Sequence, residues 1–225
     1  MEIRPIAHIE TDFKEKFGIP RQSGRVAESI GKIVFEPEYR IPEAIRGVEE
    51  FSHLWLIFDF SKNHREEFSP TVRPPRLGGN KRVGVFASRS PFRPNSLGLS
   101  SVKLIEVLKT EKEGNILIVS GADLLSGTPI YDIKPYLPFT DCHKEAVGGY
   151  ADEFESYKLS VSFPENLLLK LPEEKRSVII RVLEEDPRPS YQEDESRVYK
   201  FLFSDFQIGF RVIEKTAVVV SVEKA

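Results

Sequence analysis

The chain has 225 residues, of which 40% are hydrophobic and 30% are charged, a composition typical of a soluble globular protein. No run approaches the roughly 18 consecutive apolar residues of a membrane span, and the start lacks a signal peptide's apolar stretch, so a cytoplasmic protein is expected. The only cysteine, Cys142, excludes an internal disulfide, and four scattered histidines without metal-ligand spacing predict no metal site.

The sequence predicts a mainly β fold for residues 1–163. Short runs rich in valine, isoleucine and phenylalanine are separated by turn residues. In chain order they cover residues 3–9, 30–35, 51–60, 83–87, 97–108, 116–122 and 158–163. Strands at this spacing favour a closed sheet or barrel, because closure removes exposed edges. No Gly-x-Gly-x-x-Gly turn follows the first run, so a doubly wound nucleotide-binding fold is not expected.

Residues 164–225 differ in character and predict a small α+β domain. The apolar spacing of 164–185 fits a helix that Pro172 can interrupt, and strands are expected at 198–206, 207–212 and 217–222. Between helix and strands lies a proline-bounded turn that carries Asp186, Arg188 and Tyr191. From the residues alone, this turn is either a plain connection or a recognition surface. On this two-domain division, a barrel without residues 164–225 is expected to keep its affinity for a cofactor.

The segment from 68 to 105 contains no acidic residue, although the whole chain has a net charge of −3. It holds seven basic side chains: Arg73, Arg76, Lys81, Arg82, Arg89, Arg93 and Lys103. Many prolines and glycines surround these charges, which favours guanidinium groups held on stiff loops. Such groups suit phosphates and carboxylates. A solvated loop without function is the alternative. If the protein binds nucleic acid, this patch rather than the overall charge must provide the attraction.

Two further patterns are candidate sites. The apolar run 51–60, which includes His53 and Trp55, is typical of a buried core strand whose histidine is hydrogen-bonded. Asp132, Lys134 and Tyr136 occupy alternate positions, so on an extended strand they share one face and form a polar cluster.

Together these segments resemble the TrmO family, also called TsaA-like proteins. The resemblance spans about residues 3–222 and is carried by six motifs in order: Pro-Arg-Gln at 20–22, Phe-Ser-His-Leu-Trp at 51–55, Thr-Val-Arg-Pro-Pro-Arg-Leu-Gly-Gly-Asn at 71–80, Gly-Val-Phe-Ala-Ser-Arg-Ser-Pro-Phe-Arg-Pro-Asn at 84–95, Gly-Thr-Pro-Ile-Tyr-Asp-Ile-Lys-Pro-Tyr at 127–136 and Asp-Pro-Arg-Pro-Ser-Tyr at 186–191. It implies a β-barrel with a small C-terminal domain, usually homodimeric. The implied activity is an S-adenosylmethionine-dependent tRNA methyltransferase. Its target is the exocyclic nitrogen of threonylcarbamoyl-adenosine, just 3′ of the anticodon.

The resemblance also implies a cofactor site, carried over residue by residue. Its members are Arg21, Gln22, Ser23, Lys62, Asn63, Arg89, Leu99, Asp123 and Leu124. The chain departs from the common family pattern at several positions, including Ser61, where histidine often follows the aromatic strand, and Gln192, where arginine usually follows the tyrosine.

The chemistry of the implied reaction suggests candidates for the remaining roles. A carbamoylated exocyclic nitrogen is a poor nucleophile, so a base or a stabilising cation is expected. The candidates for catalysis are Asp132, Lys134, Tyr136 and Arg93, and those for tRNA binding are Arg73, Arg76, Asp186, Arg188 and Tyr191. A non-catalytic regulator that binds S-adenosylmethionine or RNA is the alternative. A phosphate-recognising hydrolase is disfavoured, because no metal cluster, phosphate loop or catalytic triad pattern is present in the sequence.

Overall fold

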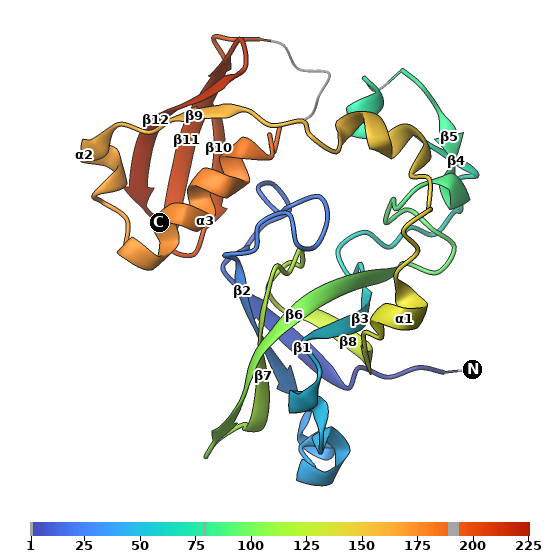
Figure 1. Cartoon of the computed structure of the whole chain (residues 1–225). Helices are drawn as coiled ribbons and strands as arrows, with labels where there is room; N and C mark the ends of the chain where they lie inside the picture. The colour runs from blue at the N-terminus through green and yellow to red at the C-terminus, as the bar shows by residue number, and fades with distance from the viewer. Residues whose placement is uncertain (1, 79, 189–193) are drawn as a thin grey trace.

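The computed structural model describes residues 2–78, 80–188 and 194–225. Six antiparallel strands close into a barrel in the order β1-β2-β7-β6-β3-β8 (Figure 1). Their bounds are β1 Ala7–Thr11, β2 Ile30–Phe35, β3 His53–Asp59, β6 Leu97–Thr110, β7 Gly114–Ser120 and β8 Thr128–Pro135. The predicted mainly β fold with an N-terminal barrel is confirmed.

Side chains of the barrel strands alternate between its core and its outer face, as the two-residue period of a strand requires. In β3, Leu54, Leu56 and Phe58 belong to the barrel core. His53 and Trp55 are only partly buried and point the other way. The predicted core strand is present, and His53 has a hydrogen-bond partner, with its Nδ1 2.9 Å from Ser52 Oγ. The expectation that this histidine is buried in the core was wrong, because only every second residue of the strand faces the core.

The C-terminal unit is a four-stranded sheet covered by helices. Its strands follow the order β10-β11-β12-β9, with bounds Tyr199–Phe203, Phe206–Ile213, Thr216–Lys224 and Ser160–Ser162. The expected helix is interrupted at Pro172, giving α2 (Glu165–Leu168) and α3 (Glu173–Glu184). The apolar stripe of α3, which includes Val178, Ile179, Val182 and Leu183, is buried against this sheet.

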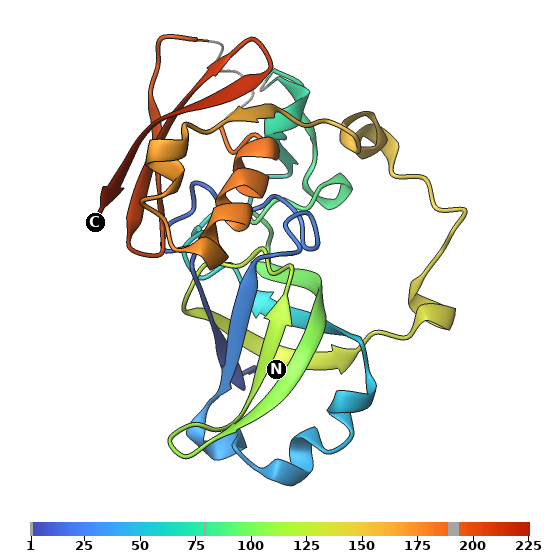
Figure 2. The ribbon, with the colours of Figure 1, turned by 60° about the vertical axis from the view of Figure 1, so that its left-hand side comes forward.

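The run 158–163, expected in the barrel part of the chain, contributes its strand to the other sheet. β9 pairs in parallel with β12, after a long connection that runs along the outside of the molecule (Figure 2). This strand lies before the predicted domain boundary at residue 163 but belongs to the C-terminal sheet. Neighbouring residues in the sequence could not reveal this partner, because it lies more than 50 residues further along the chain. The boundary itself stays a prediction.

Two other predicted strands are shorter or displaced. β1 begins at Ala7 rather than at residue 3, because Pro5 has no backbone N–H to donate to a ladder. Of the run 83–87, only Val83–Gly84 is a strand, β5, which pairs with β4 (Thr71–Val72). The remaining short elements are α1 (Pro138–Asp141) and six 3-10 turns, η1 Pro37–Tyr39, η2 Pro42–Ile45, η3 Val48–Glu50, η4 Pro75–Leu77, η5 Val85–Ala87 and η6 Gly149–Phe154.

The segment between β1 and β2 packs into the C-terminal unit instead of the barrel. Phe13 is 1% exposed and belongs to the C-terminal core, where its ring centroid lies 5.5 Å from that of Phe203. Phe17 packs against the same cluster, 6.5 Å from Phe210. Lys175 on α3 pairs with Asp12 at 2.7 Å. Residues 12–19 therefore attach the barrel to the C-terminal unit by packing into the core of that unit, which is separate from the barrel core.

Gly98 shows how tightly the barrel mouth is packed. A Cβ built on Gly98 would overlap the buried ring of Phe58, whereas one built on Gly84 would meet nothing within 4 Å. We expect Gly98→Ala to lower the free energy of unfolding by about 1–3 kcal/mol, because overpacking forces side chains and backbone to shift. Gly84→Ala is the matched control and should change it little. Denaturant titration measures both, and equal stability of the two variants would contradict the packing argument.

Among the described residues, no helix has the length and hydrophobicity needed to cross a membrane.

Candidate functional site

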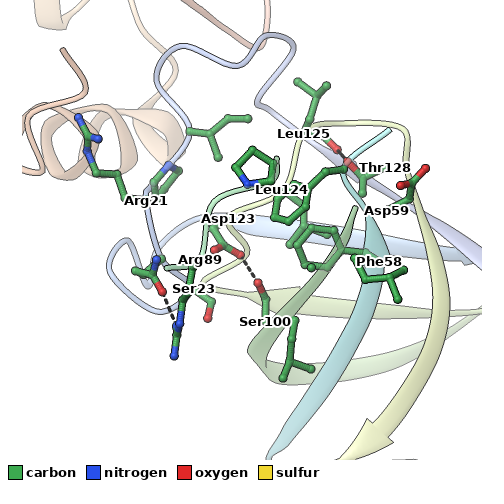
Figure 3. A pocket seen from close by; sticks show the side chains of 18 of the residues that line it. Arg21, Ser23, Phe58, Asp59, Arg89, Ser100, Asp123, Leu124, Leu125 and Thr128 are labelled. Carbon is green, nitrogen blue, oxygen red and sulfur yellow. Dashed lines mark hydrogen bonds between the residues drawn. The ribbon is translucent and has the colours of Figure 1, made fainter. Parts of the chain in front are cut away.

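A cavity of about 1020 Å³ opens at one end of the barrel and continues over the outer face of β3 and β6. Its wall combines inward-facing residues such as Phe58 and Thr128 with outward-facing ones such as Trp55 and Leu99. Loops from four parts of the chain complete it: residues 19–23, 60–63, 88–93 and 123–125. Figure 3 shows residues from three of these segments, including Ser23, Arg89 and Leu124, near Asp123.

All nine residues that the family resemblance implies for the cofactor line this cavity: Arg21, Gln22, Ser23, Lys62, Asn63, Arg89, Leu99, Asp123 and Leu124. They come from positions more than 100 residues apart in the sequence, and the barrel brings them to one opening. Among them, Leu99 is 57% exposed. An apolar side chain left exposed inside a concave site is typical of a ligand pocket.

Asp123 is the carboxylate at the centre of the labelled group in Figure 3. It accepts a hydrogen bond of 2.6 Å from Ser100 Oγ. Burial raises the pKa of the Asp123 carboxyl above its ordinary value, although the hydrogen bond from Ser100 and the charge of Arg89 oppose this shift. Burial disfavours the negative charge of Asp123 in the free protein. A cationic ligand group bound beside the carboxylate would stabilise that charge, so the position suits such a group.

Two arginines shape the wall beside Asp123. Arg89 Nη1 donates to Gln22 Oε1, which links the loop of residues 88–93 to that of residues 19–23. Arg93 Nη1 donates to the carbonyl oxygens of Val85, at 3.2 Å, and Ser88, at 2.7 Å, and so holds the turn between them. Both arginines line the cavity. Arg93 therefore has a structural role in addition to any contact with a ligand.

The Arg21 side chain points from the cavity wall toward the C-terminal unit (Figure 3). Its Nη2 donates to the carbonyl oxygens of Arg188, at 2.8 Å, and Asp186, at 3.4 Å. Asp186 in turn accepts hydrogen bonds from Tyr157 Oη and Arg188 Nε, both at 2.9 Å. Burial, followed by the charge of Arg76, lowers the pKa of Arg21. The loop of residues 19–23 is thus joined to residues 186–188.

Arg76 belongs to the same junction and not to an open surface. Its Nη2 donates to the Glu185 carbonyl oxygen at 2.9 Å, and its guanidinium carbon lies 4.5 Å from the centre of the Tyr157 ring. The Glu185 carboxylate pairs with Arg25 at 2.9 Å. Arg73, by contrast, is exposed. Three of the predicted tRNA-binding residues lie at this junction: Arg76, Asp186 and Arg188. Tyr191 lies outside the described residues.

The predicted catalytic cluster is divided. Lys134 Nζ lies 2.9 Å from Asp132 Oδ2, as expected for alternate positions on one strand face. This pair is not part of the wall of the large cavity, whereas Tyr136 and Arg93 are. Asp132 instead lines a second cavity of about 530 Å³, bounded largely by residues 35–51.

Several cavity residues were missed by the sequence reasoning. Ser100 is a buried polar residue in an alternating strand, between Gly98 and Val102, and that pattern was the available signal. Asp59 ends an apolar strand and is 7% exposed, and its Oδ1 lies 2.7 Å from His64 Nε2. For Trp55, the available signal was an aromatic side chain with a polar N–H group that lies between the core residues Leu54 and Leu56. No group of three or more metal-ligating side chains occurs in the described ranges.

Comparison with known proteins identifies the family of this chain. The model of the tRNA-methyltransferase O N-terminal domain matches residues 8–142, and that of the TrmO C-terminal domain matches residues 156–225. The chain belongs to the TrmO family. A relative from Escherichia coli K12, named tRNA (adenine(37)-N6)-methyltransferase, is 43% identical over 95% of this chain and 94% of its own length. A relative of the same name from Eikenella corrodens is 44% identical over 76% of this chain and 97% of its own.

The solved structures show the same TrmO architecture. A crystal structure of TrmO from Pseudomonas aeruginosa superposes with a TM-score of 0.77 at 30% identity, covering 99% of this chain and 98% of that one. Both the barrel and the C-terminal unit are therefore features of the family.

Proposed function

We propose that this protein transfers a methyl group from S-adenosylmethionine to the exocyclic nitrogen of threonylcarbamoyl-adenosine, next to the anticodon of tRNA. The proposal rests on one observation. All nine residues that the family resemblance implies for the cofactor line a single cavity, in a chain of the TrmO family. The names of the two bacterial relatives support the adenine N6 position and the tRNA substrate.

The donor set of the cavity fits S-adenosylmethionine, which supplies an electrophilic methyl group on a sulfonium and carries an ammonium, a carboxylate and an adenosine. Asp123 offers a negative charge that a cation would stabilise. Arg89, Gln22 and Asn63 offer donors and acceptors, and the exposed Leu99 offers an apolar contact. We propose that these residues hold the cofactor and orient its methyl group.

The reaction forms a carbon–nitrogen bond and breaks the carbon–sulfur bond, leaving a neutral thioether, and the nitrogen's proton must depart. Positioning of the two reactants provides much of the acceleration. Burial raises the pKa of Tyr136, so its hydroxyl is protonated at neutral pH and acts as a donor rather than a base. Because Arg93 lines the cavity and Arg188 does not, we propose that Arg93 receives the threonyl carboxylate. A catalytic role for Asp132 and Lys134 stays a prediction.

We propose that tRNA approaches over the basic lobe, the segment 68–95 that holds β4 and β5. Arg73→Ala should weaken tRNA binding and reduce the slope of log affinity against log salt by about 0.7 to 0.9, as one lost phosphate contact requires. Arg76→Ala is the contrasting variant: it should lower thermal stability, because Arg76 joins the lobe to Glu185. Fluorescence anisotropy at several salt concentrations measures the slope, and an unchanged slope for Arg73→Ala would reassign this residue to structure.

The test of the function uses labelled S-adenosylmethionine with tRNA that carries or lacks the threonylcarbamoyl group, followed by nucleoside analysis. Methylation of the modified tRNA alone is expected. Binding of both ligands without methyl transfer would instead support the non-catalytic regulator. The homodimer and the cytoplasmic location implied at the outset are part of the proposal, and sedimentation equilibrium measures the former.

A further inference from the structure

The large cavity is at the upper end of the size range of small-molecule pockets and extends beyond the residues assigned to the cofactor. Pockets that hold one small molecule occupy about 300–1000 Å³, and this cavity measures about 1020 Å³. The nine carried-over residues come from the loops at the barrel mouth and from Leu99. They do not include the outer face of β3 or the residue that follows β8, where the wall presents His53, Trp55 and Tyr136.

These three rings form one aromatic surface. The Trp55 and Tyr136 ring centroids are 5.5 Å apart, and those of His53 and Tyr136 are 6.1 Å apart. Trp55 Nε1 donates to Asp141 Oδ2 at 2.9 Å, and the Leu137 N–H donates to the same oxygen at 2.9 Å. The hydrogen bond satisfies the only polar group of the indole and orients its ring, and Trp55 remains partly exposed in the cavity wall.

The aromatic surface adjoins the proposed cofactor site. On the outer face of the barrel, Trp55 pairs with Ser101 and the next outward residue, Ile57, pairs with Leu99. Leu99 and Trp55 are therefore diagonal neighbours on adjacent strands, within reach of long side chains. A ring lying on Trp55 would be beside a ligand held by Leu99, as a transfer between two bound reactants requires.

The other aromatic residues of the cavity are less suited to hold a base. Phe58 is 4% exposed and lies under Gly98, and Phe60 packs edge-on against it at 5.1 Å. An exposed pair, Phe68 and Phe86, stacks at 6.3 Å on the basic lobe but does not contribute to the cavity wall.

We propose that Trp55, together with Tyr136, is the platform on which the target adenine stacks after it leaves the anticodon loop. This inference rests on the proposed function and adds the place of the acceptor base. Enzymes that modify a base take it out of its stack, and single-stranded bases are commonly held on aromatic side chains. Asp141 is a positioning residue that orients the indole. Burial of a base against Trp55 also explains why a tryptophan occupies an outward position of a barrel strand.

Steady-state kinetics with threonylcarbamoyl tRNA tests the platform. Trp55→Leu should raise the KM for tRNA by about 5- to 100-fold, the range expected for the loss of one base stack. Its affinity for S-adenosylmethionine without RNA should change little, and Trp55→Phe should recover most of the loss. Phe86→Leu tests the alternative that the base stacks on the exposed Phe68–Phe86 pair of the basic lobe. An unchanged KM for Trp55→Leu, or a larger effect for Phe86→Leu, would overturn the inference.

A second readout uses the wild-type protein and does not depend on how the variants fold. Trp55 is the only tryptophan of the chain, so the intrinsic tryptophan fluorescence reports on this position alone. Titration with an anticodon stem–loop that carries the threonylcarbamoyl group should quench it, with N-acetyl-tryptophanamide as the control for absorption by RNA. Constant emission at saturation, with binding verified by anisotropy, would contradict the platform. If the wild-type protein methylates no modified tRNA, the proposed function fails and this inference fails with it.

Discussion

Removal of residues 164–225 is expected to abolish cofactor binding as well as methyl transfer. The two-domain reading of the sequence led to the opposite expectation, that the isolated barrel keeps its cofactor affinity. In the structure, Phe13 and Phe17 are part of the C-terminal core, and Arg21 is held by the carbonyl oxygens of residues 186 and 188. Without the C-terminal unit, these rings are exposed to water and the loop of residues 20–23 loses its support.

Calorimetry with S-adenosylmethionine and binding of a dye for exposed apolar surface measure this result. The truncated chain should bind the dye and show no cofactor affinity. Arg188→Ala in the full-length chain is the milder control. The contact to Arg21 uses the backbone carbonyl of Arg188, so this variant should retain cofactor binding. A truncated chain that binds S-adenosylmethionine with wild-type affinity would show that residues 12–25 hold their conformation independently.

Asp123→Asn is expected to weaken the binding of S-adenosylmethionine without lowering the stability of the folded protein. Because burial raises the pKa of Asp123, the folded protein binds its proton more tightly than the unfolded chain does. Wild-type stability therefore falls as the pH rises from the carboxyl's ordinary pKa through its raised value in the folded state. The amide carries no charge and avoids this loss, so the variant should be at least as stable as the wild type at neutral pH.

The affinity of this variant for S-adenosylmethionine, by contrast, should fall. Loss of one member of a buried charge pair costs about 2–5 kcal/mol, so we expect S-adenosylmethionine to bind about 30- to 5000-fold more weakly to Asp123→Asn. Ser100→Ala is the matched control. It removes the hydrogen bond to the carboxylate but keeps the charge, and its effect should be smaller. Thermal melts at acidic and neutral pH, together with calorimetry, distinguish the two effects. Wild-type affinity in Asp123→Asn would remove this residue from the cofactor site.

Local patterns predicted the parts of the fold that depend on neighbours in sequence. The apolar runs around Leu54 and Val102 indicate barrel strands, and Pro172 marks the start of α3. Patterns could not predict partners that are distant in the chain, such as the pairing of β9 with β12 or the packing of Phe13 beside Phe203. In those cases, the deciding contacts exist only after the two units meet.

The same distinction applies to the candidate site. Family motifs identified residues that do line one cavity, since motif residues retain their positions on the barrel. The motifs did not distinguish an exposed arginine from one whose guanidinium forms hydrogen bonds within the protein. Arg73 and Arg76 are three residues apart in one motif, yet Arg73 is exposed and Arg76 donates to Glu185. Only the position of the C-terminal unit separates their roles.

The packing of residues 12–19 into the C-terminal core also determines when the site is completed during synthesis. Phe13 and Phe17 leave the ribosome more than 180 residues before the strands they pack against, β10 to β12. At about 5–20 residues per second, roughly 10 to 40 s separate the appearance of these partners. During this interval, the loop that carries Arg21 to Ser23 has no surface to dock on. A nascent chain therefore acquires its cofactor loop only after β12 has been made.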